Sequence, residues 1–463
     1  MSRLRSLLTT GNFRLALPAA CAIVVASALN AQQPSGGAEA LAQSAIQAIQ
    51  QGDLVKARKA LEAGSRRFPG NVEIWNLLGI ARTELHETAG ARDAFEHGLK
   101  LAPNSLPLNE NTGLLFFKEA NYPTAKKYLV KAVDLGSQSP GVKFSLAASR
   151  LRTGESARAL EELKSLEGQL GGSSDYWEER GRAEIPVDAA AAEADFARAV
   201  ELNPKSSVAL NGAASAAEKQ GLDEKALAYL IRAKQVNPND VSTLTHFGAV
   251  CIRRDLGLDA KDALERAHEL EPSNHTALFL LARANISLQN WQRAADLFTE
   301  FIRRVPQFAP AYYAIGWVDL RLNKRDEART FLEKCLQLQP DLADARVELA
   351  QLDFEDGQLQ KAEGEVRTAL QTDPKNAGGN LLMSELLLRG GQIDQARAFV
   401  ERSIETDPKL PAAHYKLATI LARQHETERA GQERALATTL AEQSKKESKT
   451  QLRLVMPDAG TIQ

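Results

Sequence analysis

The chain has 463 residues, of which 44% are apolar and 25% charged, a balance typical of a folded globular protein and not of a disordered one. Lys and Arg together number 57 against 59 for Asp and Glu, so long-range charge does not favour nucleic acid as a partner. Three cysteines are too few for a disulfide framework or a four-cysteine zinc site. We therefore expect neither a metal site nor a cofactor.

The first 31 residues have the pattern of a secretory signal peptide. Three arginines precede an uncharged apolar run from Leu15 to Ala28, and small residues follow at an acceptable cleavage position. The run is shorter than the roughly 20 residues that a membrane-spanning helix needs, although an uncleaved N-terminal anchor is an alternative. The sequence thus predicts export, to the periplasm or outside the cell, with residues 1–31 as the signal peptide and residues 32–37 as a linker.

A repeat of 34 residues dominates the rest of the sequence. Prolines recur at this spacing as Pro69 and Pro103, and then from Pro204 through Pro408. A fixed period of this length indicates stacked supersecondary units that bury one another's faces. With proline at position 32, twelve units fit, and the fifth is one residue short. The units begin at Ala38, Val72, Leu106, Pro140, Ser174, Ser207, Val241, His275, Ala309, Ala343, Ala377 and Pro411.

Three positions of the repeat predict its local structure. Position 8 is Gly, Ala or Ser and position 20 is Ala in all twelve units, which lets two helices approach closely, so each unit should be a helical hairpin. Glycine recurs at position 15, where a residue with positive φ can end the first helix. His86 and His425 share this position and lack the second histidine of a zinc helix, so we interpret both as turn residues. Cys251 and Cys335 are expected to be small core residues.

In these positions the chain resembles the tetratricopeptide repeat proteins. The resemblance implies an all-α fold, a right-handed α-solenoid superhelix of about twelve hairpins with first helices lining a concave groove. It also implies a scaffold that binds proteins or peptides. The sequence has no Gly-rich phosphate loop and no Gly-x-Ser-x-Gly motif, so we do not expect an enzyme. The family pattern is best seen in Trp75, Leu78, Gly79, Ala91, Phe95 and Pro103.

Departures from the pattern suggest how the chain is divided. The terminal proline is missing at Ser137 and Gly171 and the fifth unit is short, which predicts a kink or two semi-independent arms. The expected parts are repeats 1–5 over residues 38–206, repeats 6–12 with a polar C-terminal cap over 207–444, and a flexible tail over 445–463.

Candidate binding residues lie where helical geometry places positions 5, 9 and 13 of the first helices on the inner wall. Position 13 is basic in seven units, which suits the carboxylates of a peptide or an acidic glycan, although any helix end favours a cation. Aromatic rings join arginines in units eight and nine, a mixture typical of binding hot spots. The rings of Tyr313 and Trp317 could equally pack between hairpins. The candidates are Phe279, Arg283, Tyr313, Trp317, Arg321, Arg253 and Arg389.

The sequence therefore predicts an exported scaffold that binds a protein or peptide in its concave groove. The alternative is a scaffold or glycan-contacting component of an envelope polysaccharide export or assembly machine, because surfaces rich in aromatic residues and arginine also suit sugars. Contact with a membrane is expected only if the N-terminal segment stays uncleaved.

Overall fold

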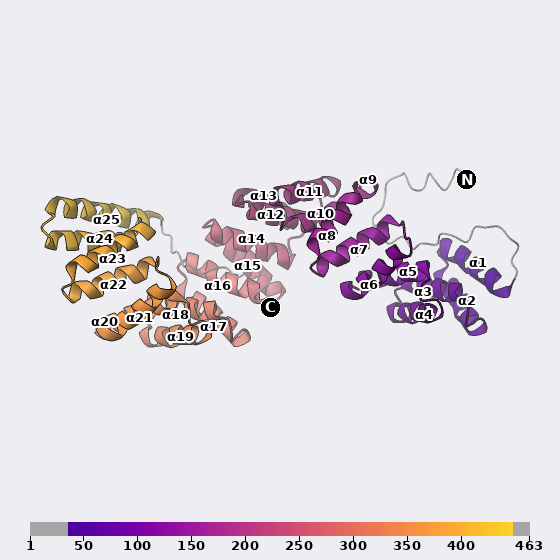
Figure 1. Ribbon diagram of the computed structural model, residues 1–463, viewed down its shortest axis with the longest axis horizontal. Coiled ribbons are helices and arrows are strands. Elements are labelled where there is room, and N and C mark those ends of the chain that lie inside the picture. The colour runs from indigo at the N-terminus through magenta and orange to yellow at the C-terminus, as the bar shows by residue number, and fades with distance from the viewer. Residues whose placement is uncertain (1–35, 448–463) are drawn as a thin grey trace. The chain divides into compact units, whose positions relative to one another are not determined.

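The structure is a computed structural model that describes residues 36–447. The predicted signal peptide and nearly all of the predicted tail lie outside these residues. All regular secondary structure between residues 36 and 447 is helical, as Figure 1 shows, and no helix there is long and apolar enough to cross a membrane. The described part of the chain divides into two compact units, with the boundary between Tyr229 and Leu230. The division falls within helix α13 (Asp223–Val236), whereas the sequence placed it before residue 207.

The first unit consists of helical hairpins that follow one another along the chain (Figure 1). Neighbouring first helices contact each other more extensively than neighbouring second helices do, so the first helices line the concave side of the unit. The first helices are α1 (Gly37–Gln50), α3 (Val72–Glu84), α5 (Leu106–Lys118), α7 (Pro140–Arg152), α10 (Ser174–Glu184) and α12 (Ser207–Lys219). The second helices are α2 (Leu54–Arg67), α4 (Thr88–Leu101), α6 (Tyr122–Asp134), α8 (Ser156–Ser165) and α11 (Ala189–Leu202).

The second unit repeats this arrangement, again with the more extensive contacts between first helices. Its first helices are α14 (Val241–Arg253), α16 (His275–Ser287), α18 (Ala309–Arg321), α20 (Ala343–Glu355), α22 (Ala377–Arg389) and α24 (Pro411–Arg423). Its second helices are α15 (Gly257–Leu270), α17 (Trp291–Arg304), α19 (Arg325–Leu338), α21 (Leu359–Thr372), α23 (Ile393–Thr406) and α25 (Thr427–Glu447).

The small residues at positions 8 and 20 mark the close approach of the two helices in a hairpin. A Cβ atom on Gly316 would lie 3.2 Å from the carbonyl oxygen of Ala328, which is position 20 of the same unit. In another unit the Ser384 hydroxyl at position 8 donates a 2.8 Å hydrogen bond to the Ala396 carbonyl. The alanine at position 20 is buried in every unit. The predicted helical hairpins are thus confirmed.

The turn between the helices of a hairpin uses the left-handed region of the backbone. The residue at position 15 of the repeat has a positive φ in eleven of the twelve units, including His86 at 60° and His425 at 64°. These values confirm that both histidines are turn residues. Only five of the eleven are glycine, so the fold imposes this conformation even where the side chain disfavours it. The positions are Gly52, His86, Ala120, Gly154, Gly221, Asp255, Gln289, Asn323, Gly357, Gly391 and His425.

In seven units, the side chain at position 4 contacts the backbone of the turn that precedes its hairpin. A nitrogen or hydroxyl of this residue lies within hydrogen-bond distance of the carbonyl oxygen six residues earlier, usually that of the proline at position 32. The carbonyl has no helical partner because the second helix has just ended. The contacts join Trp75 to Pro69, Asn109 to Pro103, Trp177 to Gly171, Tyr312 to Pro306, Arg346 to Pro340, Asn380 to Pro374 and His414 to Pro408.

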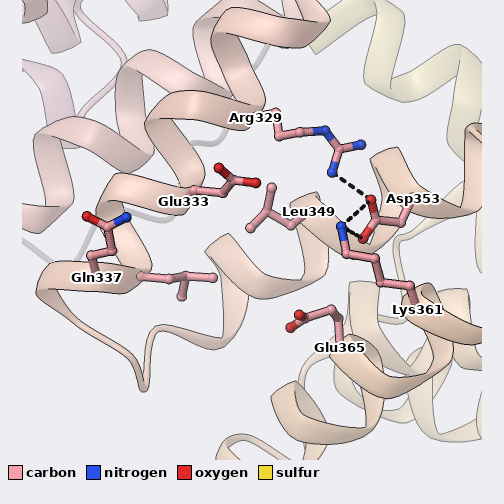
Figure 2. Close-up of a pocket in the computed structure, with 8 residues that line it drawn as sticks. Arg329, Glu333, Gln337, Leu349, Asp353, Lys361 and Glu365 are labelled. Atoms are coloured by element: carbon pink, nitrogen blue, oxygen red, sulfur yellow. Dashed lines mark hydrogen bonds and ion pairs between the residues drawn. The ribbon is translucent and has the colours of Figure 1, made fainter. Parts of the chain in front are cut away.

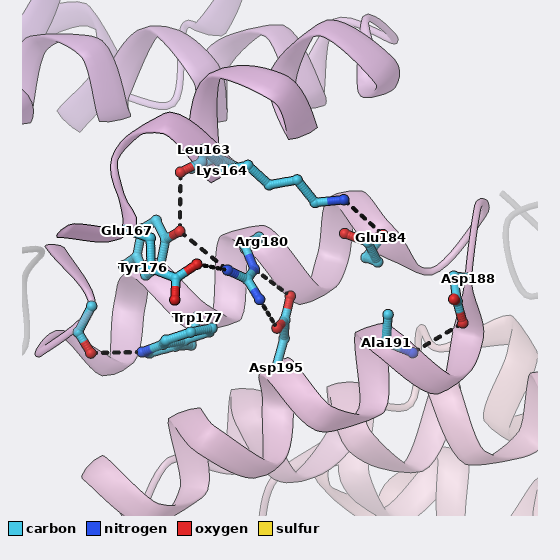
Figure 3. Close-up of polar contacts among 11 residues, drawn as sticks. Leu163, Lys164, Glu167, Tyr176, Trp177, Arg180, Glu184, Asp188, Ala191 and Asp195 are labelled. Atoms are coloured by element: carbon cyan, nitrogen blue, oxygen red, sulfur yellow. Dashed lines mark hydrogen bonds and ion pairs between the residues drawn. The ribbon is translucent and has the colours of Figure 1, made fainter.

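The irregular fifth repeat is held by a network around Arg180 on α10 (Figure 3). Arg180 donates to both carboxylate oxygens of Asp195 on α11, at 2.7 and 2.5 Å. It also donates at 2.7 Å to Glu167 on the additional one-turn helix α9 (Glu167–Leu170). Its guanidinium carbon lies 4.3 Å from the ring centroid of Trp177. One charged side chain therefore connects the added helix to the hairpin that follows it.

Candidate functional site

The candidate binding residues all belong to first helices of the second unit. Arg321 and Arg389 are exposed on the concave side, as is Arg253, whereas Arg283 is half-buried and the three aromatic residues are buried. Their helices are α14 for Arg253, α16 for Phe279 and Arg283, α18 for Tyr313, Trp317 and Arg321, and α22 for Arg389.

Phe279 does not project into the groove, so the prediction for this residue is wrong. Its side chain is 1% exposed, and its ring centroid lies 5.6, 5.3 and 5.4 Å from those of Phe298, Phe301 and Phe308. Phe298 and Phe301 lie on α17 and Phe308 directly precedes α18. The ring therefore joins a core cluster between neighbouring hairpins, where burial of apolar surface stabilises it more than exposure would.

Tyr313 and Trp317 are also packing residues to a large extent. They are 5% and 6% exposed, and the Trp317 ring meets that of Trp291 on α17 edge-on at 5.9 Å. Tyr312 is likewise buried, with its hydroxyl 3.2 Å from the Pro306 carbonyl. These contacts favour the packing interpretation, which the sequence left open for Tyr313 and Trp317. Whether either ring also contributes to binding stays a prediction.

Two of the predicted arginines stack on aromatic rings at the concave surface. The guanidinium carbon of Arg321 lies 4.3 Å from the Trp317 centroid, and that of Arg389 lies 4.0 Å from the Phe354 centroid. Neither side chain forms an ion pair with a carboxylate in the part of the chain that the structure describes. A ring beneath a guanidinium limits its freedom and favours its charge, while its outer face stays accessible.

The other two predicted arginines lie near each other. Burial, and then the charge of Arg253, lower the pKa of Arg283 to about 10. In the second unit, the first helices α14, α16, α18 and α22 thus each carry one arginine. The first unit differs at Arg152, which occupies the same repeat position and donates to both carboxylate oxygens of Glu179 at 2.8 Å.

A cavity of about 340 Å³ lies between α19, α20 and α21 and was not foreseen from the sequence (Figure 2). Its buried charge is Asp353, which is 1% exposed and accepts contacts from Arg329 at 2.6 Å and Lys361 at 3.1 Å. Because the chain's own cations already satisfy this carboxylate, the cavity wall does not require a charged ligand.

Cys251 and Cys335 are free thiols and fully buried, as expected for core residues. Burial raises the pKa of each thiol to about 12, so the reactive thiolate is disfavoured at neutral pH. Within residues 36–447 no group of three or more His, Cys, Asp or Glu side chains is placed to hold a metal ion.

Family models described as tetratricopeptide repeat match four segments of the chain. They cover residues 42–105 in the first unit and residues 258–307, 309–342 and 355–420 in the second. Each segment contains hairpins with the small residues and turns described above. No curated protein has a matching sequence.

Among solved structures, the chain is similar to one in the APC/C hetero-tetramer Cut9-Hcn1, with 14% identity, 88% of each chain covered and a TM-score of 0.44. It is also similar to MamA, with 24% identity over 35% of this chain and 96% of that chain, and a TM-score of 0.33. The matched segments in both units are tetratricopeptide repeats, and such repeats support a scaffold for protein–protein interactions.

Proposed function

We propose that the chain binds an acidic segment of a protein partner on the concave side of its second unit. The observation that carries this proposal is the pair Arg321 and Arg389. Both guanidinium groups are exposed, lie over a ring and have no ion-pair partner among the described residues. Arginine binds carboxylates through two parallel hydrogen bonds, so each can hold one acidic side chain.

Electrostatics of the neighbouring helices supports the same ligand. Burial and then the charge of Arg253 lower the pKa of Arg283, so two cations lie near each other on α14 and α16. An anion bound beside them would be attracted to both charges. Pairs of like charges in a partly desolvated surface are a frequent feature of binding sites.

The test compares two double variants that remove the same charge. Arg321→Gln with Arg389→Gln should weaken binding of a purified partner by roughly 2 kcal/mol or more, about thirtyfold, as loss of central anchors does. Arg367→Gln with Arg402→Gln is the control, since these arginines lie on the second helices α21 and α23 and Arg402 also stacks, 4.9 Å from Phe399.

Isothermal titration calorimetry measures both affinities, and far-ultraviolet circular dichroism checks that folding is intact. An equal loss for the two pairs, or no loss for the first pair, would contradict the proposal. Glycosidase treatment of the partner before titration distinguishes a protein surface from the glycan that the sequence analysis raised as an alternative.

Export is a separate proposal, supported by the apolar run between residues 15 and 28 and the arginines before it. A tagged chain should appear in the periplasmic or extracellular fraction, and deletion of residues 2–31 should leave it in the cytosol. Retention of the intact chain in the cytosol would contradict export.

A further inference from the structure

The repeat places an arginine and a glutamate in the same register at two points of the chain. Arg152 and Arg321 each occupy position 13 of a unit, and Glu179 and Glu348 each occupy position 6 of the next unit. No other pair of consecutive units has a cation and a carboxylate in these positions. The two pairs therefore form a natural comparison of one geometry.

The two pairs behave differently. Arg152 and Glu179 form a two-bond ion pair with both nitrogen–oxygen distances at 2.8 Å. Arg321 instead lies over Trp317, and neither it nor Glu348 forms an ion pair or side-chain hydrogen bond with any residue from 36 to 447. Glu348 is half-buried, and its carboxylate has no hydrogen-bond donor among the described residues.

A second polar group near Glu348 also lacks a partner. Tyr313 is 5% exposed, yet its hydroxyl makes no hydrogen bond with another described residue. Its pKa is raised by burial and then by the charges of Glu348 and Asp344, so these three side chains lie together. Asp344 is already bound, since it accepts a 2.7 Å hydrogen bond from Asn376. Of these three side chains, Glu348 and Tyr313 therefore have no hydrogen-bond partner among the described residues.

The two first helices that carry these groups make few contacts with each other. Tyr313 lies on α18 and Glu348 on α20, and these two first helices contact each other less than α20 and α22 do. Between α22 and α24, by comparison, Lys416 of α24 occupies position 6 and pairs with Glu385 of α22 at 2.8 Å. At Glu348 the charge of Arg321 partly offsets the rise of the carboxyl pKa, but the two side chains form no ion pair.

We propose that Glu348 and Tyr313 form a subsite for a lysine or arginine side chain of the bound segment, an inference that rests on the proposed function. The subsite lies beside Arg321, which holds a carboxylate of the same segment. A partly buried carboxylate without a partner disfavours the free protein, and burial raises the pKa of Glu348. An incoming cation relieves this by pairing with the carboxylate, and the Tyr313 hydroxyl can accept a hydrogen bond from the same cation. The preferred partner thus alternates acidic and basic side chains.

The experiment uses the full chain and two series of short fluorescein-labelled peptides. Each peptide carries several glutamates in a Gly-Ser background. The first series places one lysine at successive distances from a glutamate, and the second has glutamine in its place. Fluorescence anisotropy at low salt gives the affinity of each peptide for the wild type and for Glu348→Gln. Glu385→Gln is the matched control, because its carboxylate is already paired with Lys416.

The best lysine peptide should bind the wild type about fivefold or more tightly than its glutamine counterpart, a typical size for one ion pair at a partly exposed site. Glu348→Gln should abolish this advantage, Tyr313→Phe should reduce it, and Glu385→Gln should leave it intact. No lysine advantage, or an advantage that survives Glu348→Gln, would overturn the inference while the glutamine peptides still report on the proposed function. If no peptide binds, or if Arg321→Gln does not weaken the glutamine series, the proposed function itself fails.

Discussion

Replacing Gly248 with alanine tests whether the helices of a hairpin approach as closely as the structure shows. Gly248 lies within α14, and a Cβ atom there would come within 2.8 Å of both methyl carbons of Leu264, and closer still to its Cγ. Leu264 is fully buried on α15, so its side chain cannot turn away into solvent. Overpacking of this kind costs about 1–3 kcal/mol. Against it stands the preference of a helix for alanine over glycine, about 0.8–1.0 kcal/mol.

Gly364→Ala provides the matched control, because Gly364 lies within α21 of the same unit and nothing comes within 4 Å of an added Cβ. The helix preference is common to both variants, so their difference isolates the overpacking. Urea denaturation followed by circular dichroism at 222 nm should therefore separate them by about 1–3 kcal/mol, with Gly364→Ala the more stable. Equal midpoints would show that the helices are further apart than described.

Three further predictions concern stability. Ala260→Leu adds methylenes at the fully buried position 20 and should lower the free energy of unfolding by roughly 1–3 kcal/mol in the same urea assay, and an unchanged midpoint would contradict the assigned repeat frame. Ala120→Gly should raise the free energy of unfolding by up to about 1 kcal/mol, because alanine is strained at φ 57°. Only the greater freedom of glycine in the unfolded chain opposes this gain, and an unchanged or lower free energy of unfolding would contradict the strain. Burial raises the pKa of Glu348, so the folded state binds its proton more tightly than the unfolded state does. Glu348→Gln should therefore be more stable than wild type at pH 7, and this difference should shrink as the pH falls towards the unfolded pKa; a constant difference would show that Glu348 is not destabilised by burial.

The repeat frame and the hairpin could be predicted because they depend on residue types that recur. Alanine recurs at position 20 in all twelve units and is buried in each. Glycine recurs at position 15, and the backbone has a positive φ there in eleven units. The contact between the side chain at position 4 and the preceding carbonyl oxygen does not depend on one recurring residue type. Trp, Asn, Tyr, Arg and His all make it, and chemically different side chains in one column do not suggest a shared role.

The candidate site was harder to predict because a helical wheel describes one helix at a time. Phe279 lies on the expected side of α16, but phenylalanines from α17 and the following turn enclose it, and only the packed structure brings them together. Glu348 was missed for the same reason. Its significance lies in an ion pair that fails to form with Arg321, although the register would allow one.

Site-specific photocrosslinking in the cells that produce the protein would test the central claim, a protein partner bound on the concave side of the second unit, most directly. A photoreactive phenylalanine analogue would replace Gln351 or Tyr415, on the first helices α20 and α24, or Leu258, which is 67% exposed on the second helix α15. We expect the positions on α20 or α24 to crosslink to a protein whose contact peptide, identified by mass spectrometry, is rich in acidic residues. Crosslinks from Leu258 alone, or a contact peptide without acidic residues, would contradict it.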